Sequence, residues 1–263
     1  MTMTQTNTYH HPEWSYSAVL YEMNIRQLTP QGTLRAAEEK LESLKEIGID
    51  AIWLMPIYPI GEQGRKGSLG SYYSIKDYKA VNPEFGEMAD LDSFIEKAHS
   101  LGMKVLLDWV ANHTARDAKW LRTKPADWYE REDDGTAKVP WDWTDTAKLN
   151  YSNHDVWRGQ IDAMRFWVEQ HAIDGFRCDM VELVPPAFFK WLIERAKNKY
   201  PELCFIAEVY KKELYREYIR NIGFDFLYDK SGLYDTLRTV IEKNTEDNGM
   251  PVELWQSATG ITR

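Results

Sequence analysis

The chain has 263 residues, of which 43% are hydrophobic and 13% aromatic, so it can bury a large core, and disorder is excluded as its main state. Its formal net charge of −9 repels polyanions, and we therefore expect no nucleic-acid partner. No apolar run is long enough to span a membrane, and the first 14 residues lack the apolar centre of a secretory signal, so we also expect no membrane association.

Short apolar runs alternate with stretches of helical period along the chain. They predict strands at residues 18–24, 50–55, 104–108, 174–179, 203–208 and 224–228. Helices are predicted at 34–47, 88–101, 156–171, 187–199, 213–222 and 234–243. Several of these strands are apolar throughout, as parallel strands buried on both faces are. The repeated βα units therefore predict an α/β domain, either a doubly wound sheet or a barrel.

Three segments interrupt this pattern. Residues 111–155 show no clean period and contain turn signals such as Asp133-Asp134-Gly135, which predicts a small domain inserted after the third strand. Residues 61–70 contain four glycines after the second strand and predict an active-site loop. Residues 1–13 predict a flexible tail, which leaves 14–110 and 156–263 for the main domain.

The length of the chain bears on how complete a barrel it can form. An eight-unit barrel takes roughly 250 residues without insertions. Here the insertion uses much of the length, six strands are found, and residues 244–263 contain no convincing seventh strand. We therefore expect an amino-terminal piece of a longer protein.

Acidic residues close three of the predicted strands. Asp108, Asp179 and Glu208 each follow a short apolar run, and the carboxyl ends of parallel strands meet at one rim where ligands bind. Arg177 lies two residues before Asp179, so both side chains share one face of their strand. We expect Arg177 to aim Asp179, to hold it ionised and to lower its pKa.

Two carboxyl groups, one ionised and one protonated, are what glycoside hydrolysis requires. Asp179 would then be the nucleophile and Glu208 the acid/base, and a retaining mechanism would place their oxygens about 5 to 5.5 Å apart. The alternative is that each acid merely caps a βα turn. Three acids at strand ends with an arginine in register favour the catalytic interpretation.

Further site candidates lie near this rim. His113 follows the third strand and could donate a hydrogen bond to a sugar hydroxyl. Tyr73, beside the glycine-rich loop, could stack on the sugar at the nucleophile. Trp141, Trp143 and Tyr210 are candidate cleft platforms, although core packing explains them equally well.

Several motifs resemble those of the α-amylase family of glycoside hydrolases. DWVANH at 108–113, GFRCD at 175–179 and IAEV at 206–209 resemble three of the family's signatures in the right order and spacing. YEMN at 21–24 is similar to the family's first strand, and LNY at 149–151 to its short signature near the end of the inserted domain.

The resemblance implies a (β/α)8 TIM barrel, present here as about its first six βα units, with a small domain inserted after strand 3. It implies retaining cleavage or transfer at an α-glucosidic bond in starch-derived or related glucans. Asp179 would be the nucleophile, Glu208 the acid/base and Arg177 the residue that orients Asp179. Asp108 would be a buried acid near Arg177, and Tyr73 and His113 would line the sugar subsite.

The chain departs from the family pattern at two points. No Asn-His-Asp run, which carries the family's third carboxylate, occurs in 223–263, so we expect negligible catalysis from this piece alone and self-association through an open barrel edge. Glu182 stands in the family's substrate-binding region, where calcium-dependent amylases carry a basic pair, and resembles neopullulanase-like, oligosaccharide-acting members. We therefore expect no cofactor, with calcium near Asn112 as the less favoured alternative.

The sequence leaves several functions open. The alternatives to a hydrolase are a transglycosylase of the same family, a non-catalytic carbohydrate-binding or partner member, and an unrelated α/β enzyme such as a metal-dependent sugar isomerase. The isomerase would need clustered metal ligands at the rim, where His113 is the only histidine. The expected partner is an α-glucan or maltooligosaccharide. With only Cys178 and Cys204 and no signal segment, a cytoplasmic location is favoured.

Overall fold

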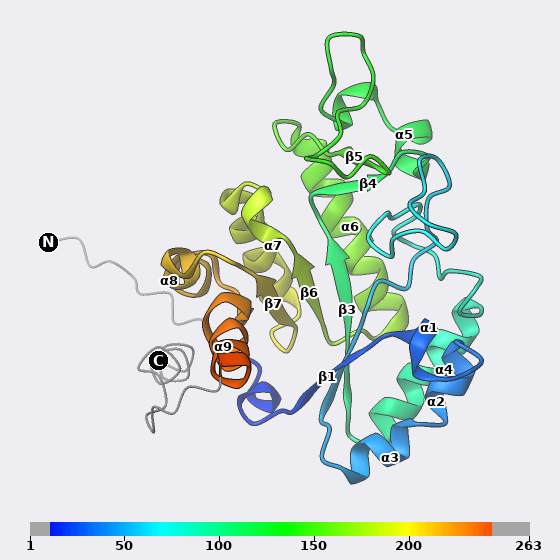
Figure 1. The fold of residues 1–263 in the computed structure, drawn as a ribbon, viewed down its shortest axis with the longest axis vertical. Helices are drawn as coiled ribbons and strands as arrows, with labels where there is room; N and C mark the ends of the chain where they lie inside the picture. The colour runs from blue at the N-terminus through cyan, green and yellow to red at the C-terminus, as the bar shows by residue number, and fades with distance from the viewer. Residues whose placement is uncertain (1–10, 244–263) are drawn as a thin grey trace, which may run out of the picture.

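A six-stranded parallel sheet organises the computed structural model, which describes residues 11–243. Its strands curl into a half-barrel in the order β1-β2-β3-β6-β7-β8, with the inserted segment at the top of the view (Figure 1). They are β1 (Leu20–Met23), β2 (Ala51–Leu54), β3 (Lys104–Val110), β6 (Gly175–Asp179), β7 (Cys204–Glu208) and β8 (Phe226–Tyr228). All six predicted strands are confirmed. Within the described residues, β1 and β8 each pair on one side and leave the other edge open.

Helices follow the strands of this sheet. They are α1 (Ile25–Leu28), α2 (Leu34–Glu38), α3 (Leu41–Glu46), α4 (Met88–Ser100), α6 (His154–His171), α7 (Pro186–Lys199), α8 (Tyr215–Glu217) and α9 (Asp235–Lys243). Of these, α2, α3, α4, α6 and α7 bury apolar side chains in the core on the outer face of the sheet. The longer ones begin at recognisable caps: Glu87 and Asp90 form a capping box on α4, and the Asn153 side chain accepts from the Asp155 amide at the start of α6.

Three predicted helices differ from the observed ones. The stretch 34–47 is two helices, because the Lys40 amide bonds the Ala37 carbonyl three residues back and makes a tighter turn between them. The stretch 213–222 holds one α-turn and then a π-helix, Tyr218–Ile222, which ends at Gly223 with φ of 103°. The last helix begins at Asp235, after a π-turn over Lys230–Tyr234.

The inserted segment is more regular than the sequence indicates. It contains a two-stranded antiparallel sheet of β4 (His113–Ala115) and β5 (Thr146–Lys148), and the short helix α5 (Lys119–Thr123). His113 therefore begins a strand, whereas the sequence predicts a loop there. Three-residue strands are too short to show a period in sequence.

Three residues of the expected amino-terminal tail, 11–13, lie within the described part of the chain. Residues 1–10 of the expected tail, like 244–263 of the main domain, lie outside the described residues. His11 contacts Asp225 at 2.9 Å, Pro12 is buried, and a 3₁₀ turn begins at Glu13. Residues 11–13 are thus anchored to the domain and are not a flexible tail.

Alternation along the strands separates two apolar layers. The outward residues, among them Trp109, Phe176 and Phe205, join the main core beneath the helices. The inward residues form a smaller cluster of Ala51, Trp53, Leu106, Cys204 and Ile206. This cluster borders a cavity of about 230 Å³ that Trp14 and Phe226 also line. The inner face of the half-barrel is therefore apolar below and, as shown next, charged at its carboxyl rim.

Candidate active site

The strand period brings four charged side chains to the inner rim. In β3, β6 and β7 the outward positions hold Trp109, Phe176 and Ala207, so the alternate positions face inward. Asp108, Arg177, Asp179 and Glu208 occupy these inward positions near the carboxyl ends of three neighbouring strands. The sheet register pairs Asp108 with Arg177 directly across β3 and β6. The predicted convergence of these residues is what the structure shows, but Asp179 and Glu208 lie within hydrogen-bond reach of each other, which is closer than the predicted separation of about 5 to 5.5 Å.

Arg177 is the centre of this group. Its Nη1 lies 3.0 Å from Asp108 Oδ1 and 3.1 Å from Asp179 Oδ1. Its Nη2 lies 2.8 Å from Glu208 Oε1. All four side chains are almost completely shielded from solvent. One buried guanidinium thus holds three carboxyl groups, which fixes the two candidate catalytic acids relative to each other.

Burial has the largest effect on the pKa values of this group, and the excess of three acids over one cation adds to it. Burial raises the pKa of Asp179 well above its usual 3.8, and the negative charges of Asp108 and Glu208 add to the rise, although Arg177 opposes it. Burial also raises the pKa of Asp108 to about 6. Arg177 does lower the pKa of Asp179, as predicted, but burial and the other two acids outweigh this effect, so the expected net lowering of the Asp179 pKa is wrong.

Asp108 accepts hydrogen bonds from Arg177 and from two aromatic residues. Its Oδ2 accepts from Trp53 Nε1 at 3.1 Å and from the Tyr73 hydroxyl at 3.2 Å. The guanidinium of Arg177 also lies over the Trp53 ring, 4.9 Å from its centroid. Asp108 has no exposed surface, so it sits beneath the site as a support, and Tyr73 is fixed at the edge of the acid cluster through its hydroxyl.

Glu208 is held from three sides. Besides Arg177, its Oε2 accepts from the Met180 amide at 2.9 Å and its Oε1 from the Tyr210 hydroxyl at 2.8 Å. Met180 follows Asp179 directly and has a left-handed backbone, with φ of 43°, that a methionine rarely adopts. Strain of this kind persists where the surroundings enforce it, and here it accompanies an amide that contacts Glu208.

His113 and Asn112 are buried where β3 leads into β4. His113 Nδ1 is 3.1 Å from Asn112 Nδ2, and its ring packs on Trp143 with centroids 5.2 Å apart. Burial lowers the pKa of His113 to about 4, so the imidazole is neutral at pH 7 and can present one donor and one acceptor. Asn112 is buried beside it, which agrees with a loop-holding role for its amide.

The Glu182 side chain is hydrogen-bonded to the main chain at Tyr210 and Lys211. Glu182 Oε1 accepts from the Tyr210 amide at 2.6 Å and from the Lys211 amide at 2.8 Å. Glu182 also lines a cavity of about 320 Å³ between the inserted segment and the start of α7, next to Tyr151 and Val184. Trp141, in contrast, is 75% exposed on the inserted segment.

Two neighbours of the cluster escaped the sequence interpretation. Trp53 lies inside β2, and Glu22 lies opposite it in β1. Burial and the charge of Glu208 raise the pKa of Glu22, although the charge of Arg177 opposes this. Glu22 therefore lies within electrostatic reach of the cluster. The run YEMN contains Glu22, but it gives no sign of which face that residue takes until the register of β1 on β2 is known.

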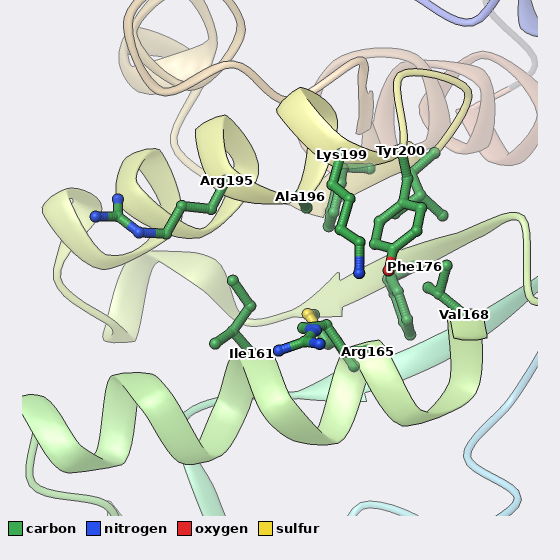
Figure 2. Close-up of a pocket in the computed structure, with 11 residues that line it drawn as sticks. Ile161, Arg165, Val168, Phe176, Arg195, Ala196, Lys199 and Tyr200 are labelled. Atoms are coloured by element: carbon green, nitrogen blue, oxygen red, sulfur yellow. The ribbon is translucent and has the colours of Figure 1, made fainter. Parts of the chain in front are cut away.

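Another pocket lies away from this rim. Figure 2 shows it between α6 and α7, where Arg165, Lys199 and Tyr200 surround the outward side chain of Phe176. Its volume is about 40 Å³, which is close to the space of a single water and far below that of a sugar ring. The rim of the half-barrel is therefore the better substrate site.

Residues 11–243 also bear on metal and membrane binding. Among them no three His, Cys, Asp or Glu side chains form a group that could hold a metal ion. No helix in the described part of the chain has both the length and the apolar character needed to cross a membrane.

Comparisons with known proteins cover most of the chain. Residues 5–222 match the family model described as alpha amylase, catalytic domain. Alpha-amylase MalA from Haloarcula japonica is 31% identical over 210 residues, which cover 76% of this chain and 30% of the relative. Alpha-1,4-glucan:maltose-1-phosphate maltosyltransferase from Rhodospirillum rubrum is 31% identical over 247 residues, 84% of this chain and 35% of the relative.

A solved structure shows the same arrangement of strands and helices. The crystal structure of an alpha-amylase from Lactobacillus plantarum aligns with a TM-score of 0.81 at 34% identity and covers 92% of this chain and 59% of that one. The chain thus spans about a third of the length of the two curated relatives and 59% of the solved one.

Proposed function

The chain belongs to the α-amylase family, and on this premise we propose that it carries the nucleophile and the acid/base of a retaining enzyme that cleaves α-glucosidic bonds in glucans. The family and the partial (β/α)8 barrel predicted from the sequence are confirmed by the family match and the Lactobacillus plantarum structure. Relatives of the chain are glycosidases or glycosyltransferases, so the protein is a glycosidase or transglycosylase of this family.

One observation carries the proposal. Asp179 and Glu208 project from neighbouring strands and contact the same guanidinium, at 3.1 and 2.8 Å. A binding module needs no such pair, whereas a retaining glycosidase needs a nucleophile and an acid on opposite sides of one bond.

In the proposed reaction Asp179 attacks the anomeric carbon as the glycosidic C–O bond breaks. Glu208 gives its proton to the leaving oxygen, and Asp179 becomes esterified to the sugar. Glu208, now a carboxylate, then removes a proton from the incoming hydroxyl, whose oxygen displaces Asp179 with overall retention. Arg177 remains charged throughout and balances the negative charge left when the proton departs.

The acid cluster suits this proton count. The raised pKa values of Asp108 and Asp179 favour a proton held among the three acids near neutral pH. Catalysis requires that proton on Glu208 and an ionised Asp179. A sugar that excludes water and places its glycosidic oxygen beside Glu208 would favour that distribution.

Water and a sugar hydroxyl are both possible acceptors. The cavity beside Glu182 measures about 320 Å³, which is within the range of small-ligand sites and supports an acceptor sugar next to the rim. We propose hydrolysis as the main reaction, and transfer to a sugar acceptor as the alternative that the maltosyltransferase relative favours.

We also propose that βα units other than those of the described residues 11–243 supply the family's third carboxylate. The open edges of β1 and β8 and the exposed side chains of Val19, Leu20 and Tyr228 beside them support this. The 263-residue chain alone should then be nearly inactive and should self-associate, which sedimentation velocity at several concentrations can test. A monomer that is fully active alone would refute the proposal.

The catalytic assignment is tested on the protein as its gene encodes it. Incubation with maltooligosaccharides, pullulan and cyclodextrins, followed by NMR of the first product anomer, should give the α-anomer. Asp179→Asn should lose at least about a thousandfold in kcat. Asp162→Asn, a like change on the exposed face of α6, is the control and should keep activity. A β-anomer, or an active Asp179→Asn protein, would contradict the assignment.

A further inference from the structure

Glu208 has partners of two chemical kinds. The Met180 amide and the Arg177 guanidinium can only donate hydrogen bonds, so each needs an acceptor oxygen of Glu208. The Tyr210 hydroxyl, 2.8 Å from Oε1, can either donate or accept by rotating its proton. It is therefore the one partner among these three that can accept a hydrogen bond from Glu208 when that residue is protonated.

We propose that Tyr210 is a positioning residue that keeps Glu208 aimed in both of its protonation states, and that Glu182 holds Tyr210 in place for this task. The inference rests on the proposed function, because it assigns a role within the same acid/base step. It replaces the expectation that Tyr210 acts as a stacking platform and Glu182 as a direct substrate contact.

The role of Glu182 follows from how little else fixes Tyr210. The tyrosine is 37% exposed and lies just beyond the end of β7, so packing alone restrains it weakly. Glu182 Oε1 accepts from two successive amides, those of Tyr210 and Lys211, at 2.6 and 2.8 Å. The Glu182 side chain is only 12% exposed, and hydrogen bonds from amides to a shielded carboxylate are strong. This pair of bonds sets the direction in which the Tyr210 side chain leaves the main chain.

The proton movements balance without consuming the tyrosine proton. Before a sugar binds, Glu208 with its proton on Oε1 donates to the Tyr210 oxygen, and when a sugar binds, this proton turns from Tyr210 to the glycosidic oxygen. After Glu208 has protonated the leaving oxygen, the Tyr210 O–H rotates and donates to the carboxylate. When Glu208 takes a proton from the incoming hydroxyl, the rotation reverses. Burial and the bond to Glu208 raise the pKa of Tyr210, so the phenol keeps its own proton through the cycle.

The experiment uses Tyr210→Phe in the protein as its gene encodes it, with two substrates. A maltooligosaccharide has a sugar leaving group that needs the proton of Glu208, whereas α-maltosyl fluoride releases fluoride with little need of an acid. We expect a loss of about tenfold to a hundredfold in kcat on the maltooligosaccharide, with KM changed by less than about twofold. On the fluoride we expect a change in kcat/KM, which reports formation of the intermediate, of less than about twofold.

Tyr215→Phe is the matched control. Tyr215 also donates its hydroxyl to a carboxylate, Asp229 Oδ1 at 2.6 Å, and it follows Tyr210 by five positions. Its loss should leave kcat on both substrates within about twofold of the wild type.

Variants of Glu182 test the second half of the proposal. Glu182→Ala should show the same selective loss on the maltooligosaccharide. Glu182→Gln keeps an oxygen acceptor for the two amides and should recover most of the activity. Glu182→Ala combined with Tyr210→Phe should lose no more than Tyr210→Phe alone, since both act through one contact.

The outcomes separate this inference from the proposed function. Equal losses on both substrates with a raised KM would make Tyr210 a sugar contact and overturn the inference. Unchanged kcat on the maltooligosaccharide would overturn it as well, while the proposed function would stand. A wild-type protein inactive on both substrates would refute the proposed function, and this inference with it.

Discussion

Replacing Asp108 by asparagine should stabilise the protein in alkaline solution more than in acid. The carboxyl group of Asp108 is fully buried and accepts from Trp53, Tyr73 and Arg177. The asparagine side chain would keep one oxygen for these donors and remove the charge. Arg177 would still face Asp179 and Glu208, so no cation would be left unpaired.

The magnitude follows from the two pKa values of Asp108. Its pKa rises from 3.8 to about 6 on folding, a difference of about 2.2 units or about 3 kcal/mol. A raised pKa means that the folded state holds the proton more tightly than the unfolded state. The stabilisation that the proton provides is complete below pH 3.8 and is lost as the pH rises through about 6. At pH 8 the unfolding free energy of the wild type is therefore about 3 kcal/mol lower than in strong acid, whereas at pH 4 it is only about 0.6 kcal/mol lower.

Urea unfolding of wild type and Asp108→Asn at pH 4 and pH 8 measures this difference. The change in unfolding free energy caused by the substitution should be more favourable at pH 8 than at pH 4 by about 2 kcal/mol. Asp174→Asn is the control. Burial of Asp174 favours a raised pKa, but His99, Lys104 and the Val105 amide together lower it below 3.8, so the stabilisation by its carboxylate is lost only in stronger acid and its replacement should cost nearly the same at pH 8 and at pH 4. An effect of Asp108→Asn that is equal at both pH values would refute the reasoning.

Three further predictions concern other parts of the structure. The wild type should lose about 3 kcal/mol of unfolding free energy as the pH falls from 6.5 to 4, because the pKa of His113 is about 4 in the folded state and the unfolded state binds the proton first. His113→Gln should remove this loss, which is measured by following the unfolding free energy of wild type and variant against pH. Gly175→Ala should lower the melting temperature by an amount equivalent to about 1 to 3 kcal/mol or more, since the added Cβ would lie 2.2 Å from the Cys204 carbonyl oxygen; a variant as stable as the wild type would contradict the close strand contact. Phe176→Ala should cost about 3 to 5 kcal/mol in urea unfolding, because its ring is fully buried between β6 and the helices, and a loss under about 1 kcal/mol would mean that the outer core is loosely packed there.

Much of the site could be predicted because strand geometry is visible in sequence. Three apolar runs that end in acids locate the carboxyl ends of β3, β6 and β7. The spacing of two between Arg177 and Asp179 places them on one face, as the 3.1 Å contact bears out. These features depend on local chain geometry and on the rule that parallel strands end at a shared rim.

The remaining features depend on tertiary contacts that local patterns do not encode. The nearest charge in sequence, Arg177, predicts a lowered pKa for Asp179, but burial and two more acids outweigh that cation. Glu22 and Trp53 join the site only through the register of β1 on β2. The contacts of Glu182 with the Tyr210 and Lys211 amides connect loops after different strands, so no local sequence pattern indicates them.

The position of Arg177 in the middle of the sheet has a consequence for how such an enzyme is built. Its three acidic partners come from β3, β6 and β7, and the two edge strands contribute none of them. On a ribosome, which releases the amino end first, every member of this ion cluster has been synthesised once Glu208 emerges. Whatever later attaches along β1 or β8 meets charges that are already arranged, and can change which sugar is admitted without having to rebuild the reacting groups.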